Sequence, residues 1–166
     1  MRGIEFEVLW LDQDVVKYQV TCSNGSFCGA TRMYLAQHDL SKTAQILSGF
    51  PSDIKDTRDV QLGAFEPTAA GGGIHMSFRC IDSIGHAVAL VRLRADGCKG
   101  PAEPETVCLY VPVEAGSIDS FVSEARSIEA RAIDDTQEAK ANLRMADHPF
   151  SWVRLSLVKF SVPSWR

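Results

Sequence analysis

The chain has 166 residues, 45% hydrophobic and 23% charged, with a formal net charge of -4 at pH 7. These values are typical of one soluble globular domain with a hydrophobic core of ordinary size. The acidic balance argues against nucleic acid as the main partner, because phosphate binding needs a basic surface. No run of about 18 apolar residues is present, so we expect no membrane span.

Three strands are predicted in the first 35 residues, because apolar side chains occupy alternate positions there. The three runs are 4–11, 15–22 and 26–35. Between the second and third runs, Asn24-Gly25 is the pair preferred in two-residue hairpin loops. That loop sets Cys22 opposite Phe27 and turns Cys22 and Cys28 to opposite faces of the sheet, so these two thiols cannot form a disulfide within it. Gly29 indicates a bulge or bend in the third strand.

The middle of the chain predicts a helix, a strand and a flexible connection. The helix spans 39–50, with Gly49 ending it and Pro51 preventing its extension. The strand spans 60–66. The glycine-rich segment 67–73 (PTAAGGG) is predicted to be a flexible linker. It is not a phosphate loop, since a strand follows it and the Gly-Lys-Ser/Thr ending is missing.

The stretch 73–95 predicts a β-hairpin at the middle of an antiparallel sheet, with Asp82-Ser83-Ile84-Gly85 as its turn. A three-residue loop that ends at Gly85 sets Phe78 opposite Leu90. A two-residue loop sets Phe78 opposite Val91 instead. We favour the first register, because the second forces the β-branched Ile84 to a positive φ.

The last elements complete an α+β fold. Segment 105–114 predicts a strand, and Pro112 places it at a sheet edge or a bulge because proline donates no ladder hydrogen bond. Segment 116–131 predicts an amphipathic helix. We expect a curled antiparallel sheet of six or seven strands, continuous or split into two layers, with two helices packed on it. Residues 1–131 form this single domain, and 132–166 form an extension with a weak helix and an added strand within 149–166.

The sequence contains no recognisable catalytic constellation. No Cys-x-x-Cys or His-x-x-x-His pair is present, so neither a metal nor another cofactor is expected. Cys98 has Lys99 beside it but no histidine base nearby in the sequence, which favours an ordinary loop thiol over a nucleophile. Asp82 near His86 is best explained as turn chemistry. We therefore predict a protein that is not an enzyme.

An acidic loop is the candidate binding site. Asp53, Asp56 and Asp59 could steer a basic partner. Lys55 and Arg58 interrupt these charges, so a solvated loop is the alternative.

Cysteine usage and the first residues bear on the compartment. The chain has five cysteines, an odd number, and residues 1–5 lack the apolar stretch of a secretion signal. Both features predict free thiols in a reducing cytoplasm.

Four segments carry a family resemblance: Val20–Leu35 (VTCSNGSFCGATRMYL), Leu40–Pro51 ending in Leu-Ser-Gly-Phe-Pro, Gly73–Leu93, and the strand and helix of Val107–Ile128. Their order resembles small bacterial proteins described as uncharacterised or as immunity proteins of polymorphic toxin systems, including the family named for the wall-associated toxin. The resemblance implies a cytoplasmic protein that binds and blocks a cognate toxin, and it implies no catalytic residues.

Two other interpretations stay open. One is a small-molecule-binding or enzymatic domain with a pocket between sheet and helices. The residues expected in that pocket are His75, Arg79, His86, Arg92 and Tyr110. The other is a homo-oligomer in which the strand within 149–166 pairs with another chain.

Overall fold

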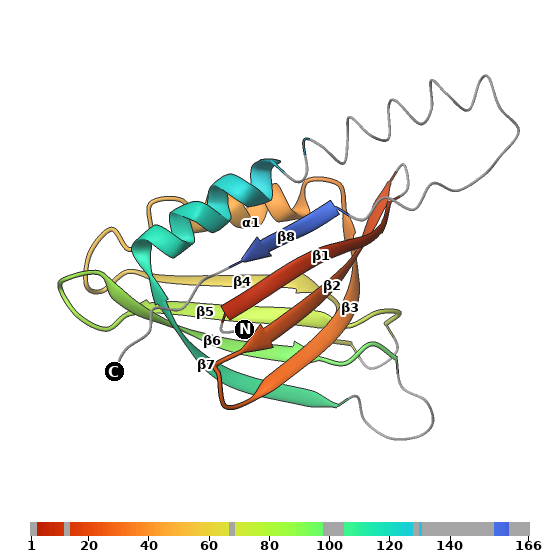
Figure 1. Cartoon of the computed structure of the whole chain (residues 1–166), viewed down its shortest axis with the longest axis horizontal. Helices are drawn as coiled ribbons and strands as arrows, with labels where there is room; N and C mark the ends of the chain where they lie inside the picture. Colours follow the sequence, from red (N-terminus) through yellow and green to blue (C-terminus); the bar gives the residue numbers. More distant parts are fainter. Residues whose placement is uncertain are drawn as a thin grey trace, which may run out of the picture.

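The computed structural model describes residues 3–11, 14–66, 69–97, 105–127 and 130, and the backbone of 155–159. The described strands form two four-stranded antiparallel sheets, with two helices packed against them (Figure 1). In spatial order, sheet A contains β3 (Cys28–Ala36), β2 (Val15–Ser23), β1 (Gly3–Leu11) and β8 (Leu155–Lys159). Sheet B contains β4 (Thr57–Gly63), β5 (Gly73–Cys80), β6 (His86–Arg94) and β7 (Thr106–Glu114). The predicted α+β class with antiparallel sheets and two helices is confirmed.

The two helices lie together along one side of the sheets (Figure 1). α1 (Asp39–Leu47) connects β3 to β4, and a helix at 115–127 follows β7 directly. α1 ends three residues before the predicted end, and Gly49 follows it at φ 73, the left-handed conformation expected just beyond a helix. β3 contacts β4, β5 and β6, whereas β7 contacts β1 and β2, so the strands of sheet A cross those of sheet B.

The hairpin between β2 and β3 has a longer loop than its sequence predicts. Asn24 Oδ1 accepts hydrogen bonds from the backbone amides of Ser26 and Phe27, at 3.0 and 2.9 Å. This closes a four-residue loop, and Ser23 pairs with Cys28. The predicted pairing of Cys22 with Phe27 is therefore wrong.

The two thiols of this hairpin have different environments. Cys22 is buried and Cys28 is exposed, so they do point to opposite faces of the sheet. Burial raises the pKa of the Cys22 thiol to about 12. The four cysteines in the described residues are free thiols.

Gly29 forms a close contact between the sheets instead of a bulge. The β2–β3 register runs through it without a shift, so the predicted irregularity is wrong. A Cβ at Gly29 would lie 2.6 Å from Val107 Cγ1 on β7. The missing side chain lets β3 approach sheet B at this point.

The central hairpin is also shifted from its predicted register. Phe78 pairs with Ala89, so the predicted pairing with Leu90 is wrong. Asp82 Oδ1 accepts hydrogen bonds from the amides of Ile84 and His86, at 3.0 and 3.1 Å. These bonds stabilise a four-residue loop, which is one residue longer than the predicted one.

β7 lies at the edge of sheet B, as Pro112 predicts. Pro112 is paired with Val88 on one side only, and its missing N–H therefore costs no ladder hydrogen bond on the open side.

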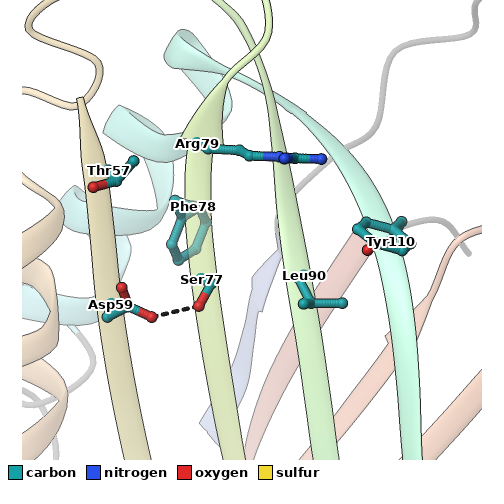
Figure 2. A pocket seen from close by; sticks show the side chains of 7 residues that line it. All are labelled: Thr57, Asp59, Ser77, Phe78, Arg79, Leu90 and Tyr110. Atoms are coloured by element: carbon teal, nitrogen blue, oxygen red, sulfur yellow. Dashed lines mark hydrogen bonds between the residues drawn. The ribbon is translucent and has the colours of Figure 1, made fainter. Parts of the chain in front are cut away.

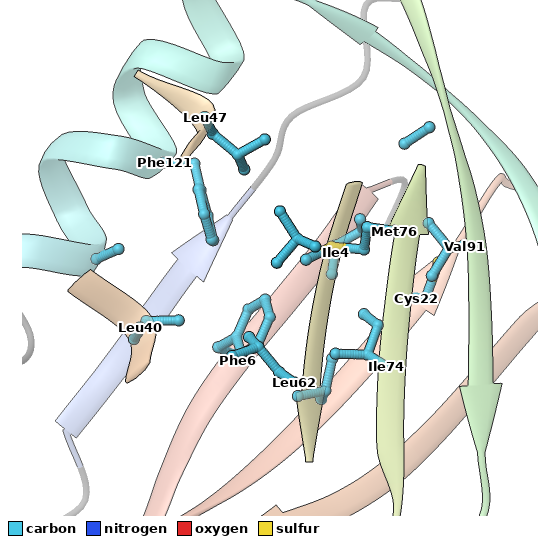
Figure 3. Packing of buried hydrophobic residues seen from close by; sticks show 14 of the residues in the cluster. Ile4, Phe6, Cys22, Leu40, Leu47, Leu62, Ile74, Met76, Val91 and Phe121 are labelled. Atoms are coloured by element: carbon cyan, nitrogen blue, oxygen red, sulfur yellow. The ribbon is translucent and has the colours of Figure 1, made fainter. Parts of the chain in front are cut away.

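The space between the two sheets and the helices is filled by one apolar core (Figure 3). Side chains from β1 to β7 and from both helices converge there, some of which are drawn in the figure. The Phe6 ring lies 5.8 Å from that of Phe121 on the second helix and 6.4 Å from that of Tyr18, measured between centroids. Such ring pairs each contribute about 0.5–1.5 kcal/mol beyond their burial.

The glycine run at the start of β5 is a packed junction, so the prediction of a flexible linker over 67–73 is wrong for Gly71, Gly72 and Gly73. Gly71, Gly72 and Gly73 are all buried. The amide of Gly72 donates to Arg32 O at 2.7 Å, and its carbonyl accepts from the amide of Ala64 at 3.0 Å. Glycine is present because other chain segments occupy the space of a side chain, and not because the segment is loose.

The Arg94 side chain also bonds to this glycine segment. It is buried, and its Nη1 donates to Gly71 O at 2.7 Å and to Ala64 O at 3.3 Å. The Thr31 hydroxyl donates to the Arg94 carbonyl at 2.6 Å. Side chains and backbone from β3, β6 and the glycine segment are thus bonded into one cluster, which we call the glycine junction.

Some predicted features lie outside the described residues. These are the loop thiol Cys98 and the weak helix within 132–148. The described helices include none with the length and apolar character needed to cross a membrane.

Candidate functional site

The three predicted site residues do not form one cluster. Asp53 and Asp56 lie in the loop before β4, and Asp59 lies on β4 itself. Asp53 Oδ1 accepts a hydrogen bond from the amide of Lys55 at 2.6 Å, a local turn contact. Only Asp59 faces the outer surface of sheet B.

Asp56 is a structural residue of the loop. Its carboxylate accepts two hydrogen bonds from Arg58, at 2.7 and 2.9 Å, and two from the amide and hydroxyl of Ser52, at 2.8 and 2.9 Å. The side chain of Asp56 is only 8% exposed. The hydrogen bonds from Arg58, followed by those from Ser52, outweigh burial and hold the pKa of Asp56 well below its usual value. Arg58 also donates to Ile46 O at 2.7 Å, so the pair fastens the end of α1 to β4.

We expect Asp56→Asn to destabilise the protein by about 1–3 kcal/mol at pH 6, because the charged acceptor of Arg58 is lost. The folded-state pKa of Asp56 lies below its unfolded value, so this stabilisation is present above about pH 4 and decreases as the pH falls from there towards the folded pKa. Urea unfolding at pH 6 and pH 2.5 measures the difference. Asp53→Asn is the matched control in the same loop. If Asp56→Asn lost the same free energy of unfolding at both pH values, the ionised carboxylate of Asp56 would not be the stabilising group.

The open surface of sheet B is formed by every second residue of its strands, and we call it the outer face of sheet B. From β4 to β7 these residues are Thr57, Asp59 and Gln61; His75, Ser77 and Arg79; Val88, Leu90 and Arg92; and Cys108, Tyr110 and Pro112. Their register places Asp59, Ser77, Leu90 and Tyr110 side by side in one row across the sheet.

A shallow hollow of about 300 Å³ lies on this face (Figure 2). Its lining includes Thr57, Asp59, Ser77, Arg79, Leu90 and Tyr110. Tyr110 is 58% exposed and Leu90 is 36% exposed, so the hollow presents apolar surface to solvent. The guanidinium of Arg79 forms no hydrogen bond or ion pair with any described residue.

A polar group on the same face contains Asp59, Ser77 and His75. Its hydrogen-bond order differs from the one that nucleophilic catalysis needs. Asp59 Oδ1 accepts a hydrogen bond from the Ser77 hydroxyl and lies 3.2 Å from His75 Nε2. The carboxylate therefore lies between the hydroxyl and the imidazole, whereas an activated serine is bonded to the imidazole. This arrangement orders polar side chains and does not generate a nucleophile.

The residues expected in an interior pocket lie elsewhere. Arg79, Arg92, His75 and Tyr110 are on the outer face of sheet B, and apolar side chains fill the described space between sheets and helices. His86 lies at the hairpin turn, with its Nδ1 2.5 Å from Asp82 Oδ2. Desolvation raises the pKa of Asp82, but the hydrogen bonds from His86 and Ile84 outweigh it and lower that pKa below its ordinary value. Among the described residues, no three His, Cys, Asp or Glu side chains come close enough to hold a metal ion.

Sequence reasoning gave no role to Leu90 and Ser77, which complete the hollow. Leu90 belongs to a nearly continuous apolar run, and only the register of β6 shows that it points outward. Arg79 and Tyr110 are predicted in an interior pocket, but they lie on the outer face because their neighbours Phe78 and Leu109 face the core.

No protein-family model, no curated protein and no solved structure matches this chain. The resemblance to immunity proteins stays a prediction.

Proposed function

We propose that this protein is a non-enzymatic, cytoplasmic binding protein that blocks a cognate protein toxin. The observation that supports binding is the exposed set of Tyr110, Leu90 and Arg79 on the outer face of sheet B. Tyrosine and arginine are enriched among the residues that dominate protein–protein affinity, especially where they surround apolar surface. Between the sheets and the helices, the described space is filled by apolar side chains.

The resemblance supplies the class of partner, a toxin. The paired strands and the filled core also give a preorganised surface. Such a surface loses little conformational entropy on binding, which suits inhibition by rigid docking. Blocking of this kind needs only that the complex covers the toxin's active surface.

Pairwise binding to the products of neighbouring genes tests the proposal. We expect one of these products to bind the full chain with a Kd of about 10⁻⁷ M or tighter, a range common for interfaces of standard size. Co-expression of the chain should then restore growth of cells that produce that toxin. Isothermal titration calorimetry and growth curves measure the two effects. Failure of every neighbouring product to bind, in 50 and 200 mM salt, would remove the proposed function.

A further inference from the structure

Two arginines on the outer face of sheet B have no ion-pair partner among the described residues. Two carboxylates share this face. Asp59 accepts a hydrogen bond from Ser77 and lies 3.2 Å from His75 Nε2, and Glu114 lies two residues beyond Pro112 on β7. Arg79 and Arg92 are exposed, and neither forms an ion pair with any residue in the described ranges. The guanidinium of Arg92 lies 5.5 Å from the centroid of the Phe65 ring, a contact that orients it without cancelling its charge. The two guanidinium groups are thus available to carboxylates of a partner, although the chain as a whole has a net charge of -4.

The strand register fixes how these arginines are spaced. Arg79 lies one row above Leu90 and Tyr110, and Arg92 lies one row below them. A strand rises about 3.4 Å per residue and neighbouring strands are about 4.8 Å apart, so the two arginine Cα atoms are roughly 14 Å apart. The apolar pair occupies the space between two basic positions.

We propose that the outer face of sheet B docks an acidic segment of a partner protein. Two carboxylates of that segment bind Arg79 and Arg92, and an apolar side chain between them packs on Leu90 and Tyr110. Arginine favours carboxylates because its planar fork donates two parallel hydrogen bonds to them. A nucleic acid fits this face less well, since typical DNA-binding proteins make about 6–10 phosphate contacts and only two arginines are present.

This inference rests on the proposed function and names the surface and the chemistry of its partner. It is tested first by photo-crosslinking in the host cell. The photoreactive residue p-benzoylphenylalanine replaces Thr57, which lines the hollow, or, as a control, the 69% exposed Phe27 in the β2–β3 loop. We expect the probe at position 57 to attach to one protein, at a segment with two acidic residues around an apolar one, and the probe at position 27 not to attach to it.

Affinity measurements with that purified partner then test whether Arg79 binds a carboxylate and whether Tyr110 contributes to the interface. We expect Arg79→Glu to weaken binding about 30-fold or more and Tyr110→Ala to do the same, which is the threshold for dominant interface residues. Replacing the facing carboxylate of the partner by arginine should restore binding to Arg79→Glu. Arg126→Glu is the matched control, because it makes the same change of net charge on the exposed surface of the 115–127 helix.

The outcomes separate this inference from the proposed function. A partner that binds tightly but is insensitive to Arg79→Glu, or that crosslinks through a basic segment, overturns the docking assignment and leaves the proposed function standing. Crosslinking to nucleic acid, or the absence of any protein adduct at position 57, overturns the docking assignment, whereas the proposed function falls only if the neighbouring gene products also fail to bind.

Discussion

Gly72→Ala is expected to destabilise the protein by at least about 3 kcal/mol, because the glycine junction has no room for a methyl group. A Cβ at Gly72 would overlap the Thr31 hydroxyl and the Arg94 carbonyl oxygen. The hydroxyl can rotate away, but the carbonyl belongs to the backbone of β6 and cannot. For a chain of this size the melting temperature should fall by roughly 6–12 °C. Thermal unfolding followed by circular dichroism measures it.

Two further variants make this prediction specific. Gly116→Ala, in the second helix, meets no atom within 4 Å and should be neutral or stabilising by up to about 1 kcal/mol. The double variant Gly72→Ala/Thr31→Ala should stay unstable, since the Arg94 carbonyl remains. If the double variant regained full stability, the Thr31 hydroxyl alone would limit the space at Gly72.

Arg94→Met should cost about 2–4 kcal/mol of unfolding free energy. The substitution roughly preserves side-chain volume but removes the charged donor of Gly71 O and Ala64 O, which are then left without these hydrogen bonds. Urea denaturation measures the loss. Proteolysis near Ala64 and Gly71 should also become faster, because the Arg94 side chain bonds to both of their carbonyls.

Arg92→Met is the matched control for Arg94→Met, since it removes the same group two residues earlier on β6. Arg92 is exposed and contacts the Phe65 ring, so its loss should cost less than about 1 kcal/mol. If both variants lost the same stability, the carbonyl contacts of Arg94 would not be the cause.

The sequence was sufficient to predict strands wherever one face alone is apolar. Ile4, Phe6 and Val8 alternate with charged residues, and all three are buried in β1. Pro112 predicts either an edge position or a bulge for its strand, because proline lacks a ladder donor, and β7 has the edge position.

Register was harder to predict, for two physical reasons. β6 reads HAVALVRLR and is apolar at both parities over much of its length, so its pattern does not say which residues face inward. In addition, Asn24 and Asp82 accept backbone hydrogen bonds inside their loops, which favours four-residue loops over the shorter turns that their glycines suggest. A loop of different length changes every pairing after it.

The glycine junction and the outer face of sheet B depend on contacts between distant segments. Glycine composition alone cannot distinguish a loose linker from a segment pressed against Thr31 and Arg94. Likewise Arg79, Leu90 and Tyr110 come from three strands, and only the paired sheet brings them onto one surface.

The pairing of β1 with β8 has a consequence for synthesis of the chain. Phe6 pairs with Val158, so sheet A is completed by a strand translated long after its first three. A ribosome adds about 120 residues between the end of β3 and the start of β8, which takes roughly 6–24 s at 5–20 residues per second. During that interval the nascent chain carries an unpaired β1 edge, a template for association with other emerging polypeptides.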